Sequence, residues 1–475
     1  MKRLLSILFS ICSLVAFAQQ KKMAGIWEGT PTGVPLRLVF QFSEDAKGKF
    51  TCKWKSPQQS PKFWPTDSTY IIGDSIFTSS AQFHITFNGK LINDSTITGS
   101  FVQGASFALQ LKKVQAITEV KRPQTPVGPF PYDSHDTIFF NAAKTIQFGA
   151  TLTYPKSQVG KATYPVAILI TGSGPQDRDE TMFLHKPFAV IADHLTKNGF
   201  AVLRVDDRGI GKSTGNFQTA TTADFADDVE AAIDYVKTLP QIDTNKIGLI
   251  GHSEGGMIAP MVASRRKEVQ FIVLLAGPGI PIIDLMNEQV EAVSLSNGKS
   301  VRASKFSGEF IELMIEAVNK SSDSTILYAN LSNIHKMIEQ WAVKTDSSVL
   351  LELDMATLPK REEAVAAKLA ALQGAWYKYF IQFTPVQYLK KLHCNVLALN
   401  GEKDIQVLPA SNTAGILAAL KESKAKKYEV KVLPGLNHLF QACKKCTVSE
   451  YGDLEETFSP PALDIITNWL KKNVQ

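Results

Sequence analysis

Strand-like and helix-like segments alternate through the C-terminal part of this chain, and that alternation constrains its fold most. Continuous apolar runs at 166–171 and 247–250 are typical of strands buried on both faces. Amphipathic helical patterns at 187–198 and 222–238 separate them. Further strands are expected at 201–205, 271–275, 396–399 and 428–433. Such alternation implies right-handed βαβ units, so we predict a mainly parallel α/β sheet within residues 135–475, with helices on both faces.

The region from residue 19 to residue 118 has a different pattern. Apolar and polar residues alternate in short runs, and no long helical pattern interrupts them. The expected strands are 36–42, 50–55, 75–77, 83–87, 96–101 and 106–111, with turns at Asn88-Gly89 and Asn93-Asp94. We therefore predict a small all-β domain, either an antiparallel sandwich or a small barrel. Four prolines between residues 121 and 133 indicate a semi-rigid linker, which we place at 119–134.

Residues 281 to about 385 interrupt the α/β alternation with helical patterns alone. Apolar residues recur at helical spacing from Phe306 to Val318, and further helices are expected at 331–345 and 360–382. An insertion beyond the C-terminal end of a strand is typical of a cap over an active site. The alternative is an ordinary helical extension packed on one side of the domain.

The first 18 residues resemble a secretory signal peptide. Lys2 and Arg3 precede an apolar run, and Ala16-Phe17-Ala18 forms an A-x-A cleavage site. The run is shorter than the roughly 20 residues of a membrane span, and no later segment qualifies. We expect a soluble product, exported to the periplasm or secreted. The net charge of +6 in 475 residues is weak and scattered, which argues against a nucleic-acid partner.

Export permits disulfides, and four cysteines remain after the signal peptide. Cys443-Lys444-Lys445-Cys446 has C-x-x-C spacing, which occurs both in redox proteins and in small structural bridges. Because it does not open a thioredoxin-like βαβ unit, a structural bridge is favoured. One such pair cannot form a four-cysteine zinc site.

The strongest chemical motif is Gly251-His252-Ser253-Glu254-Gly255, which fits the G-x-S-x-G pattern. A predicted strand precedes it and a predicted helix follows it, as a nucleophile elbow requires. The two glycines suit a turn too tight for side chains. The turn would expose the Ser253 hydroxyl, and the helix N-terminus would favour negative charge beside it.

A serine hydroxyl needs a base, and in this arrangement an acid and then a histidine follow the serine along the chain. Asp404 follows the strand 396–399, and His438 follows the strand 428–433. We predict that His438 accepts the Ser253 proton and that Asp404 orients the imidazole. Glu402 is the competing acid. The side chain of His252, adjacent to the nucleophile, should diverge from it.

An oxyanion hole needs two donors. We expect the Glu254 N–H and the N–H of Ser173, or else of Gly174, in the loop after the strand 166–171.

Charged loops at 176–180 and 206–211 allow a metal site, but Arg178 and Arg208 favour ion pairs, so no metal or cofactor is predicted. Gly211-Lys212-Ser213 resembles the end of a phosphate-binding loop. Asp206 stands where that loop requires glycine, which excludes this interpretation.

In combination, the segments 171–180, 206–213 and 251–256 resemble those of exported bacterial α/β-hydrolases. The resemblance covers about residues 135–475. It extends to EstD-type esterases and, more distantly, to the prolyl-oligopeptidase catalytic domain. It implies an α/β-hydrolase fold and a carboxylesterase that acts on small acyl esters without a metal or cofactor. Thr171 departs from many esterases, which often have histidine there.

Three functions follow in order of preference. The first is ester hydrolysis through an acyl-enzyme, with a small-molecule ester as substrate, while a ligand or partner of the β-domain stays open. The second is a serine peptidase or aminopeptidase with the same triad. The third is a non-catalytic binding protein on a hydrolase scaffold.

Overall fold

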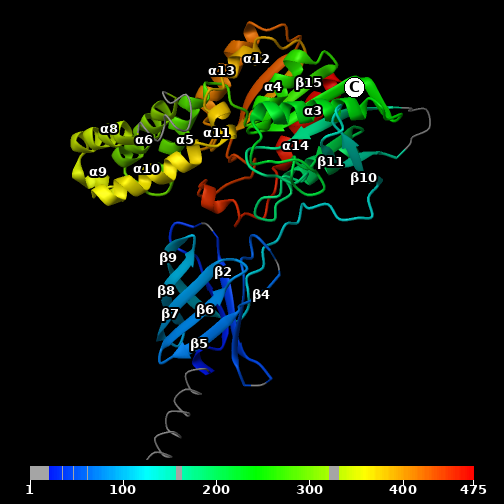
Figure 1. The fold of residues 1–475 in the computed structure, drawn as a ribbon. Coiled ribbons are helices and arrows are strands. Elements are labelled where there is room, and N and C mark those ends of the chain that lie inside the picture. The colour runs from blue at the N-terminus through cyan, green and yellow to red at the C-terminus, as the bar shows by residue number, and fades with distance from the viewer. Residues whose placement is uncertain are drawn as a thin grey trace, which may run out of the picture. The chain divides into compact units, whose positions relative to one another are not determined.

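The computed structural model describes residues 21–34, 36–46, 48–60, 62–156, 163–319 and 331–474. The predicted signal peptide, residues 1–18, lies outside them. The chain divides into two compact units (Figure 1). Unit 1 comprises residues up to 123 together with two short segments, 182–184 and 448–455, and unit 2 comprises the rest. The two segments join unit 1 in part through Arg122, whose guanidinium donates to the carbonyls of Phe183 and Gly452.

Unit 1 contains one continuous antiparallel sheet of nine strands, so the predicted all-β character is confirmed. Its order is β4-β3-β2-β1-β9-β8-β7-β6-β5. The strands are β1 (Gly25–Gly29), β2 (Leu38–Glu44), β3 (Phe50–Lys55), β4 (Trp64–Pro65), β5 (Ser68–Ile72), β6 (Ser75–Ser80), β7 (Ile85–Asn93), β8 (Thr96–Gln103) and β9 (Ala105–Val114). Alternate residues of the long strands enclose an apolar core around Trp27, Phe40 and Phe87. Two stacked sheets, as in a sandwich, are not formed.

One predicted turn is wrong. Asn88-Gly89 lies inside β7, whereas Asn93-Asp94 does connect β7 to β8 as expected. The alternation of buried Ile85, Phe87 and Leu91 carries the strand through the Asn-Gly pair. Gly89 faces Gly99 on β8. The two glycines allow a close approach of the strands, because a Cβ on Gly99 would lie 2.0 Å from the Asn88 carbonyl oxygen.

Unit 2 contains an eight-stranded sheet in the order β10-β11-β13-β12-β14-β15-β16-β17. Its strands are β10 (Tyr132–Phe140), β11 (Gln147–Pro155), β12 (Tyr164–Ile170), β13 (Ala201–Val205), β14 (Ile242–His252), β15 (Val269–Leu275), β16 (Asn395–Gly401) and β17 (Tyr428–Leu433). β10, β11 and β13 pair antiparallel, and all pairings from β13 to β17 are parallel. This is the predicted α/β-hydrolase fold. The linker prediction extended to residue 134, but β10 already begins at Tyr132.

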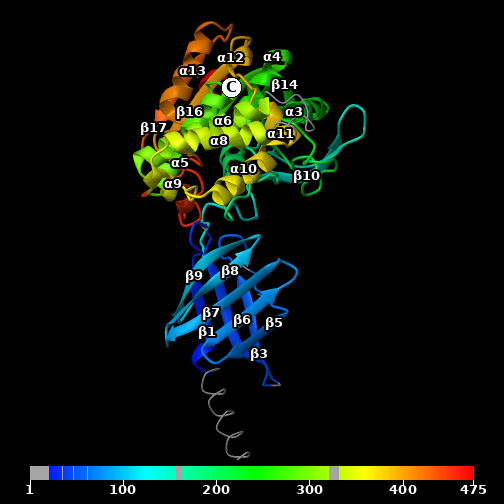
Figure 2. The same ribbon diagram turned by 60° about the vertical axis from the view of Figure 1, so that its left-hand side comes forward.

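Helices cover both faces of this sheet (Figure 2). They are α2 (Pro187–Lys197), α3 (Thr222–Val236), α4 (Gly255–Arg265), α13 (Pro409–Lys421) and α14 (Pro460–Asn473). Successive residues of β12 point to opposite faces, as strand geometry requires. Ile168 joins the core beneath α3, α4 and α13, while Leu169 joins the core beneath α2 and α14. Because both faces are covered, the central strands are continuously apolar.

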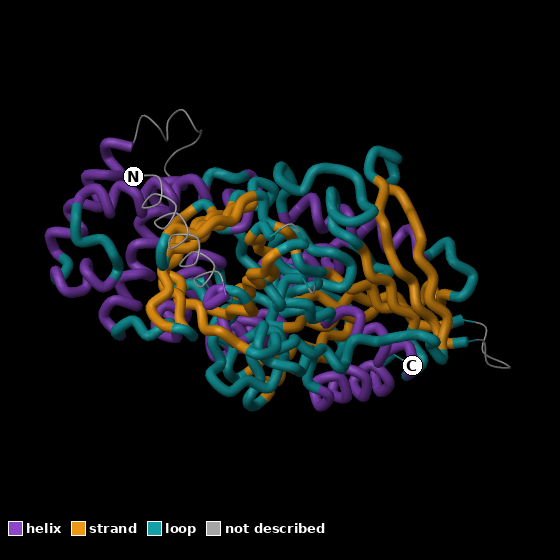
Figure 3. Tube along the Cα trace, turned by 90° about the horizontal axis from the view of Figure 1, so that it is seen from below, coloured by secondary structure: helices purple, strands orange, loops and turns teal. Residues whose placement is uncertain are grey.

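The insertion between β15 and β16 is helical, as expected. Its helices are α5 (Ile282–Ser296), α6 (Val301–Asn319), α8 (Leu331–Lys344), α9 (Ser347–Glu352), α10 (Leu358–Leu372), α11 (Ala375–Phe380) and α12 (Val386–Leu389). Figure 3 shows most of them as a group of helices without strands. Met314, Ile338 and Leu369 belong to a separate apolar core within this group. The single helix predicted at 360–382 is two helices, because Gly374 has an extended conformation with ψ 145°.

Among the described residues, no helix combines the length and the apolar character that crossing a membrane requires.

The glycine pair of β7 and β8 gives a stability prediction. Gly99→Ala should lower the free energy of unfolding of unit 1 by about 3 kcal/mol, because the new methyl group meets backbone atoms that cannot rotate away. Urea denaturation monitored by tryptophan fluorescence measures the change. Lys90→Ala, at an exposed position of β7, is the control and should change stability by less than about 0.5 kcal/mol. Equal stability of the two variants would contradict the close approach of the strands.

Candidate active site

Ser253 lies in the turn between β14 and α4. Its φ is +53°, a left-handed conformation that non-glycine residues seldom adopt. Such a conformation costs of order 1–3 kcal/mol and persists only where the surroundings impose it. The Ser253 N–H donates to the Leu275 carbonyl at 2.9 Å, and the Ser253 carbonyl accepts from the Gly256 N–H at 2.8 Å. The strained turn is therefore fixed by both the sheet and the helix.

The flanking glycines are required by close backbone contacts. A Cβ on Gly251 would lie 2.0 Å from the Gly255 carbonyl oxygen. A Cβ on Gly255 would lie 2.2 Å from the carbonyl oxygen of Ile170, at the end of β12. The G-x-S-x-G spacing thus allows the turn to close and α4 to begin directly beside the end of β12.

His438 and Asp404 lie together beyond the C-terminal ends of β17 and β16. Their Nδ1 and Oδ2 atoms are 2.8 Å apart, and both side chains are buried. The other carboxylate oxygen of Asp404 accepts from the N–H groups of Gln406 and Val407. These bonds fix the carboxylate toward the imidazole. Glu402, the competing acid, instead accepts from the Gly435 N–H, and its side chain is 46% exposed.

His252 connects the serine turn to the His438 loop. Its ring centroid lies 4.9 Å from that of His438, and its Nε2 lies 3.0 Å from the His438 carbonyl oxygen. Because Ser253 directly follows His252, the turn and the His438 loop meet at this contact. The prediction that the side chains of His252 and Ser253 diverge gave His252 no role. The His252 ring instead contacts the His438 loop.

The charge of His252 follows from its partners. Nδ1 lies 2.9 Å from Oε1 of Glu180, and Nε2 faces a carbonyl, so both nitrogens face acceptors. With Glu180 ionised, both ring nitrogens donate and the ring is an imidazolium. Burial alone would lower the pKa of His252, but the Glu180 carboxylate outweighs it and the pKa is raised.

Glu180 also holds the loop after β12. Its Oε1 accepts from the Gly172 N–H at 2.7 Å. A Cβ on Gly172 would lie 3.2 Å from the Cβ of Ser253, so this loop lies against the serine. The Gly172 N–H is thus already engaged. Within the described residues the N–H groups of Ser173 and Glu254 donate no hydrogen bond, which leaves both predicted oxyanion donors available.

The Glu254 side chain forms a second buried junction. Its Oε1 accepts from the Thr222 hydroxyl at 2.6 Å and from Nε1 of Trp376 at 2.8 Å. Burial raises the pKa of Glu254, and these two donors, together with the Ser173 side chain, oppose that increase. One carboxylate therefore joins the serine turn to α3 and to α11 of the insertion.

The charged loops near the site contain the predicted ion pairs. Arg178 contacts Asp206 at 2.6 Å, and Arg208 contacts both carboxylate oxygens of Asp228 at 2.7 Å. Asp207 differs, because its partners are the Thr171 hydroxyl and the Gln176 N–H. Burial raises the pKa of Asp207 to about 7. The carboxylates of Asp206, Asp207 and Asp228 therefore all accept hydrogen bonds from other groups of the protein.

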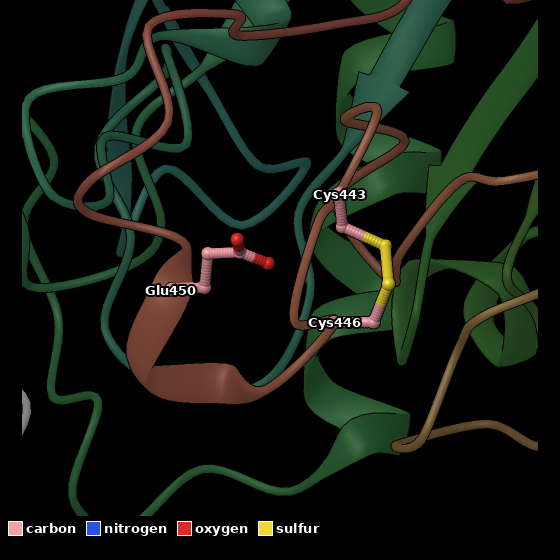
Figure 4. A group of neighbouring side chains, drawn as sticks. All are labelled: Cys443, Cys446 and Glu450. Carbon is pink, nitrogen blue, oxygen red and sulfur yellow. A yellow bond between two sulfur atoms is a disulfide. The ribbon is translucent and has the colours of Figure 1, made fainter.

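Cys443 and Cys446 form the favoured structural bridge, a disulfide (Figure 4). Cysteine binds metals as a thiolate, and a disulfide contains no thiolate, so these two sulfurs are not metal ligands in this form. Cys52 and Cys394 are buried free thiols.

A family model described as Serine aminopeptidase, S33 matches residues 186–441, more than half of the chain. The chain belongs to this family. The match begins just before α2 and includes Ser253, Asp404, His438 and the whole helical insertion.

Several known proteins are similar to parts of this chain. Esterase EstD of Thermotoga maritima is 33% identical over 141 residues, which are 30% of this chain and 32% of that protein. This chain therefore spans about a third of the length of EstD. An uncharacterized 31.7 kDa protein of Escherichia coli is 22% identical over 287 residues, covering 60% of this chain and 84% of that protein. The crystal structure of hypothetical protein PA2218 from Pseudomonas aeruginosa is 16% identical, covers 75% of this chain and 98% of that chain, and has a TM-score of 0.43.

The imidazolium of His252 predicts a pH dependence of stability. Its pKa is raised in the folded protein above the ordinary value of about 6.5, so the folded state binds this proton more tightly. Its contribution is complete below about pH 6.5 and is lost as the pH rises through the folded pKa. His252→Gln should remove this contribution. Urea denaturation between pH 6 and pH 9 measures both proteins, and the stability difference between them should shrink as pH rises. A constant difference would show that His252 is neutral.

The Trp376 contact predicts an effect on activity. Trp376→Phe removes one donor from the buried Glu254 carboxylate and should lower kcat/KM for an ester about tenfold, the effect of one hydrogen bond of about 1.4 kcal/mol. Trp341→Phe is the matched control on α8, because its Nε1 has no hydrogen-bond partner among the described residues. That variant should retain its activity. Equal losses in both variants would mean that indole packing, not the hydrogen bond, matters.

Proposed function

We propose that this chain is a serine hydrolase that cleaves carboxylic esters through an acyl-enzyme, with Ser253 as nucleophile, His438 as base and Asp404 as acid. The observation that carries the proposal is the 2.8 Å contact between Nδ1 of His438 and Oδ2 of Asp404. His252 links the His438 loop to the strained Ser253 turn. A strained serine between two required glycines has no evident structural purpose. It suits a hydroxyl that must project from the sheet edge.

The proposed reaction begins when the ester carbonyl lies against Ser253. His438 accepts the hydroxyl proton as Oγ attacks the carbonyl carbon, and the carbonyl oxygen becomes negative. The N–H groups of Glu254 and Ser173 would stabilise that oxygen, with Gly174 as the alternative second donor. His438 then protonates the departing alcohol. Water hydrolyses the acyl-enzyme by the same steps, and Asp404 stabilises the imidazolium each time it forms.

A carboxylic ester is favoured over an aminoacyl amide as substrate. An aminopeptidase must bind a substrate ammonium, for which a carboxylate is the natural partner. The acids next to the proposed oxyanion loop are engaged within the protein, since Glu254 accepts from Thr222 and Trp376, and Asp207 accepts from Thr171. The curated relative EstD is named an esterase. These observations support an esterase for small acyl esters.

Aminopeptidase activity is the second candidate, because the family description names a serine aminopeptidase. The same triad would attack an amide carbonyl. The two functions differ in the ratio of kcat/KM for an aminoacyl anilide and for an acyl ester of similar size. A ratio above one would favour the peptidase.

We also propose export through a signal peptide at residues 1–18. The disulfide between Cys443 and Cys446 supports this location, because such bonds persist in oxidising compartments such as the periplasm.

Replacing the nucleophile tests the proposed function directly. Ser253→Ala should lower kcat for short acyl esters by up to about 10⁶-fold and should abolish labelling by a fluorophosphonate probe. Ser264→Ala, on the helix α4 that follows the Ser253 turn, is the matched control, because its hydroxyl only donates to the Met261 carbonyl. That variant should keep wild-type turnover and labelling. Turnover that persists in pure, folded Ser253→Ala would refute the proposed nucleophile.

A further inference from the structure

A groove on the helical insertion is not explained by the proposed reaction. It has a volume of about 380 Å³ and lies among α5, α6, α10 and the loop after α9. Its wall is mainly apolar and includes Val290, Phe310, Ile311, Leu353 and Met355. None of its lining residues belongs to the candidate active site. Ligand pockets typically have volumes of roughly 300–1,000 Å³ and an apolar lining with a few polar groups.

One charged residue, Lys368 on α10, lines this apolar groove. Lys368 is half-buried, so its side chain is partly removed from water, and this burial lowers its pKa. Among the described residues it forms neither a hydrogen bond nor an ion pair, and no carboxylate opposes the effect of burial. A partly desolvated cation without a partner is unfavourable, and an anion at this position would relieve the cost.

The sequence of α10 explains why Lys368 has no partner on its own helix. The residues three and four positions away are Ala364, Val365, Ala371 and Leu372, so no acid occupies an ion-pairing position. The other cations of this helix are paired. Lys360 contacts Glu363 at 3.2 Å, and Arg361 contacts Glu339 at 2.7 Å. Lys368 differs from both in facing an apolar groove.

We propose that the groove binds a medium-chain aliphatic carboxylate, with its chain along the apolar wall and its carboxylate on the Lys368 ammonium. The single cation matches one negative charge. The apolar side chains match a hydrocarbon chain. Two serines also line the groove, and the hydroxyl of one of them, Ser307, already donates to the Ala303 carbonyl. None of the groove residues belongs to the proposed triad or supplies a proposed oxyanion donor, so this proposal does not rest on the proposed ester hydrolysis.

Dodecanoate binding to the full-length protein tests the proposal. The probe is titrated below its micellar range by calorimetry. The fluorescence of Trp341, whose ring centroid lies 5.8 Å from that of the groove residue Phe310, serves as a second readout. Dodecanol has the same chain without the charge, and butyrate has the charge without the long chain. We expect dodecanoate to bind at least tenfold more tightly than either one.

Two substitutions identify the site. Lys368→Met keeps the length of the side chain but removes its charge, and it should weaken dodecanoate binding roughly tenfold or more while changing dodecanol binding less than about threefold. Lys336→Met, at an exposed position of α8, is the matched control and should change neither. Ala371→Trp should fill the groove and weaken both probes, with circular dichroism used to check that the helices persist.

Other outcomes would overturn the proposal. Dodecanoate that does not bind, or that binds equally well to Lys368→Met and to the wild-type protein, would exclude the assigned partner. Equal affinity for dodecanol and dodecanoate would make the groove a neutral apolar site. Purely competitive inhibition of ester turnover that is unchanged by Lys368→Met would place the carboxylate in the catalytic site instead. Loss of turnover in Ser253→Ala bears only on the proposed function, so the two proposals fail separately.

Discussion

The buried contact between Glu180 and His252 holds together the three loops on which the candidate site depends. Glu180 contacts the loop after β12 through the Gly172 N–H, and His252 contacts the His438 loop through its carbonyl. A neutral imidazole has only one N–H and would leave one of its two acceptors unmatched. With Glu180 ionised, His252 is positively charged, and the two opposite charges compensate each other within a buried contact.

Glu254 forms a separate junction with a different purpose. Its backbone N–H faces the proposed reaction, while its side chain points into the protein toward Thr222 and Trp376. Trp376 belongs to the insertion, and its ring also stacks on Phe380 with centroids 4.6 Å apart. The position of α11 is thus coupled to the residue after the nucleophile. This coupling offers a route by which the insertion influences the proposed oxyanion donors without contacting them.

The features that could be predicted from the sequence are those that depend on residues close together along the chain. Buried strands are mainly apolar, so the central strands such as β12 and β15 were evident from their composition, as were the Ser253 turn and the order of Asp404 and His438. The roles of Glu180 and Trp376 depend on partners 72 and 122 residues away, at His252 and Glu254. No local pattern indicates such contacts. Glu180 lay in a charged run that was interpreted as ion pairs with arginine. The Asn88-Gly89 turn prediction was wrong because the alternation of buried and exposed residues along β7 continues through this pair.

The apolar core of the insertion has a consequence for how this protein can diverge. Residues such as Met314 and Leu369 pack among themselves and not against the sheet, so the helical group largely carries its own cohesion. Changes in those helices can therefore accumulate while the eight-stranded scaffold stays intact. The hydrogen bond from Trp376 to Glu254 restricts that freedom at one position near the end of the insertion. Descendants of this chain would be free to reshape the insertion wherever this anchor is retained.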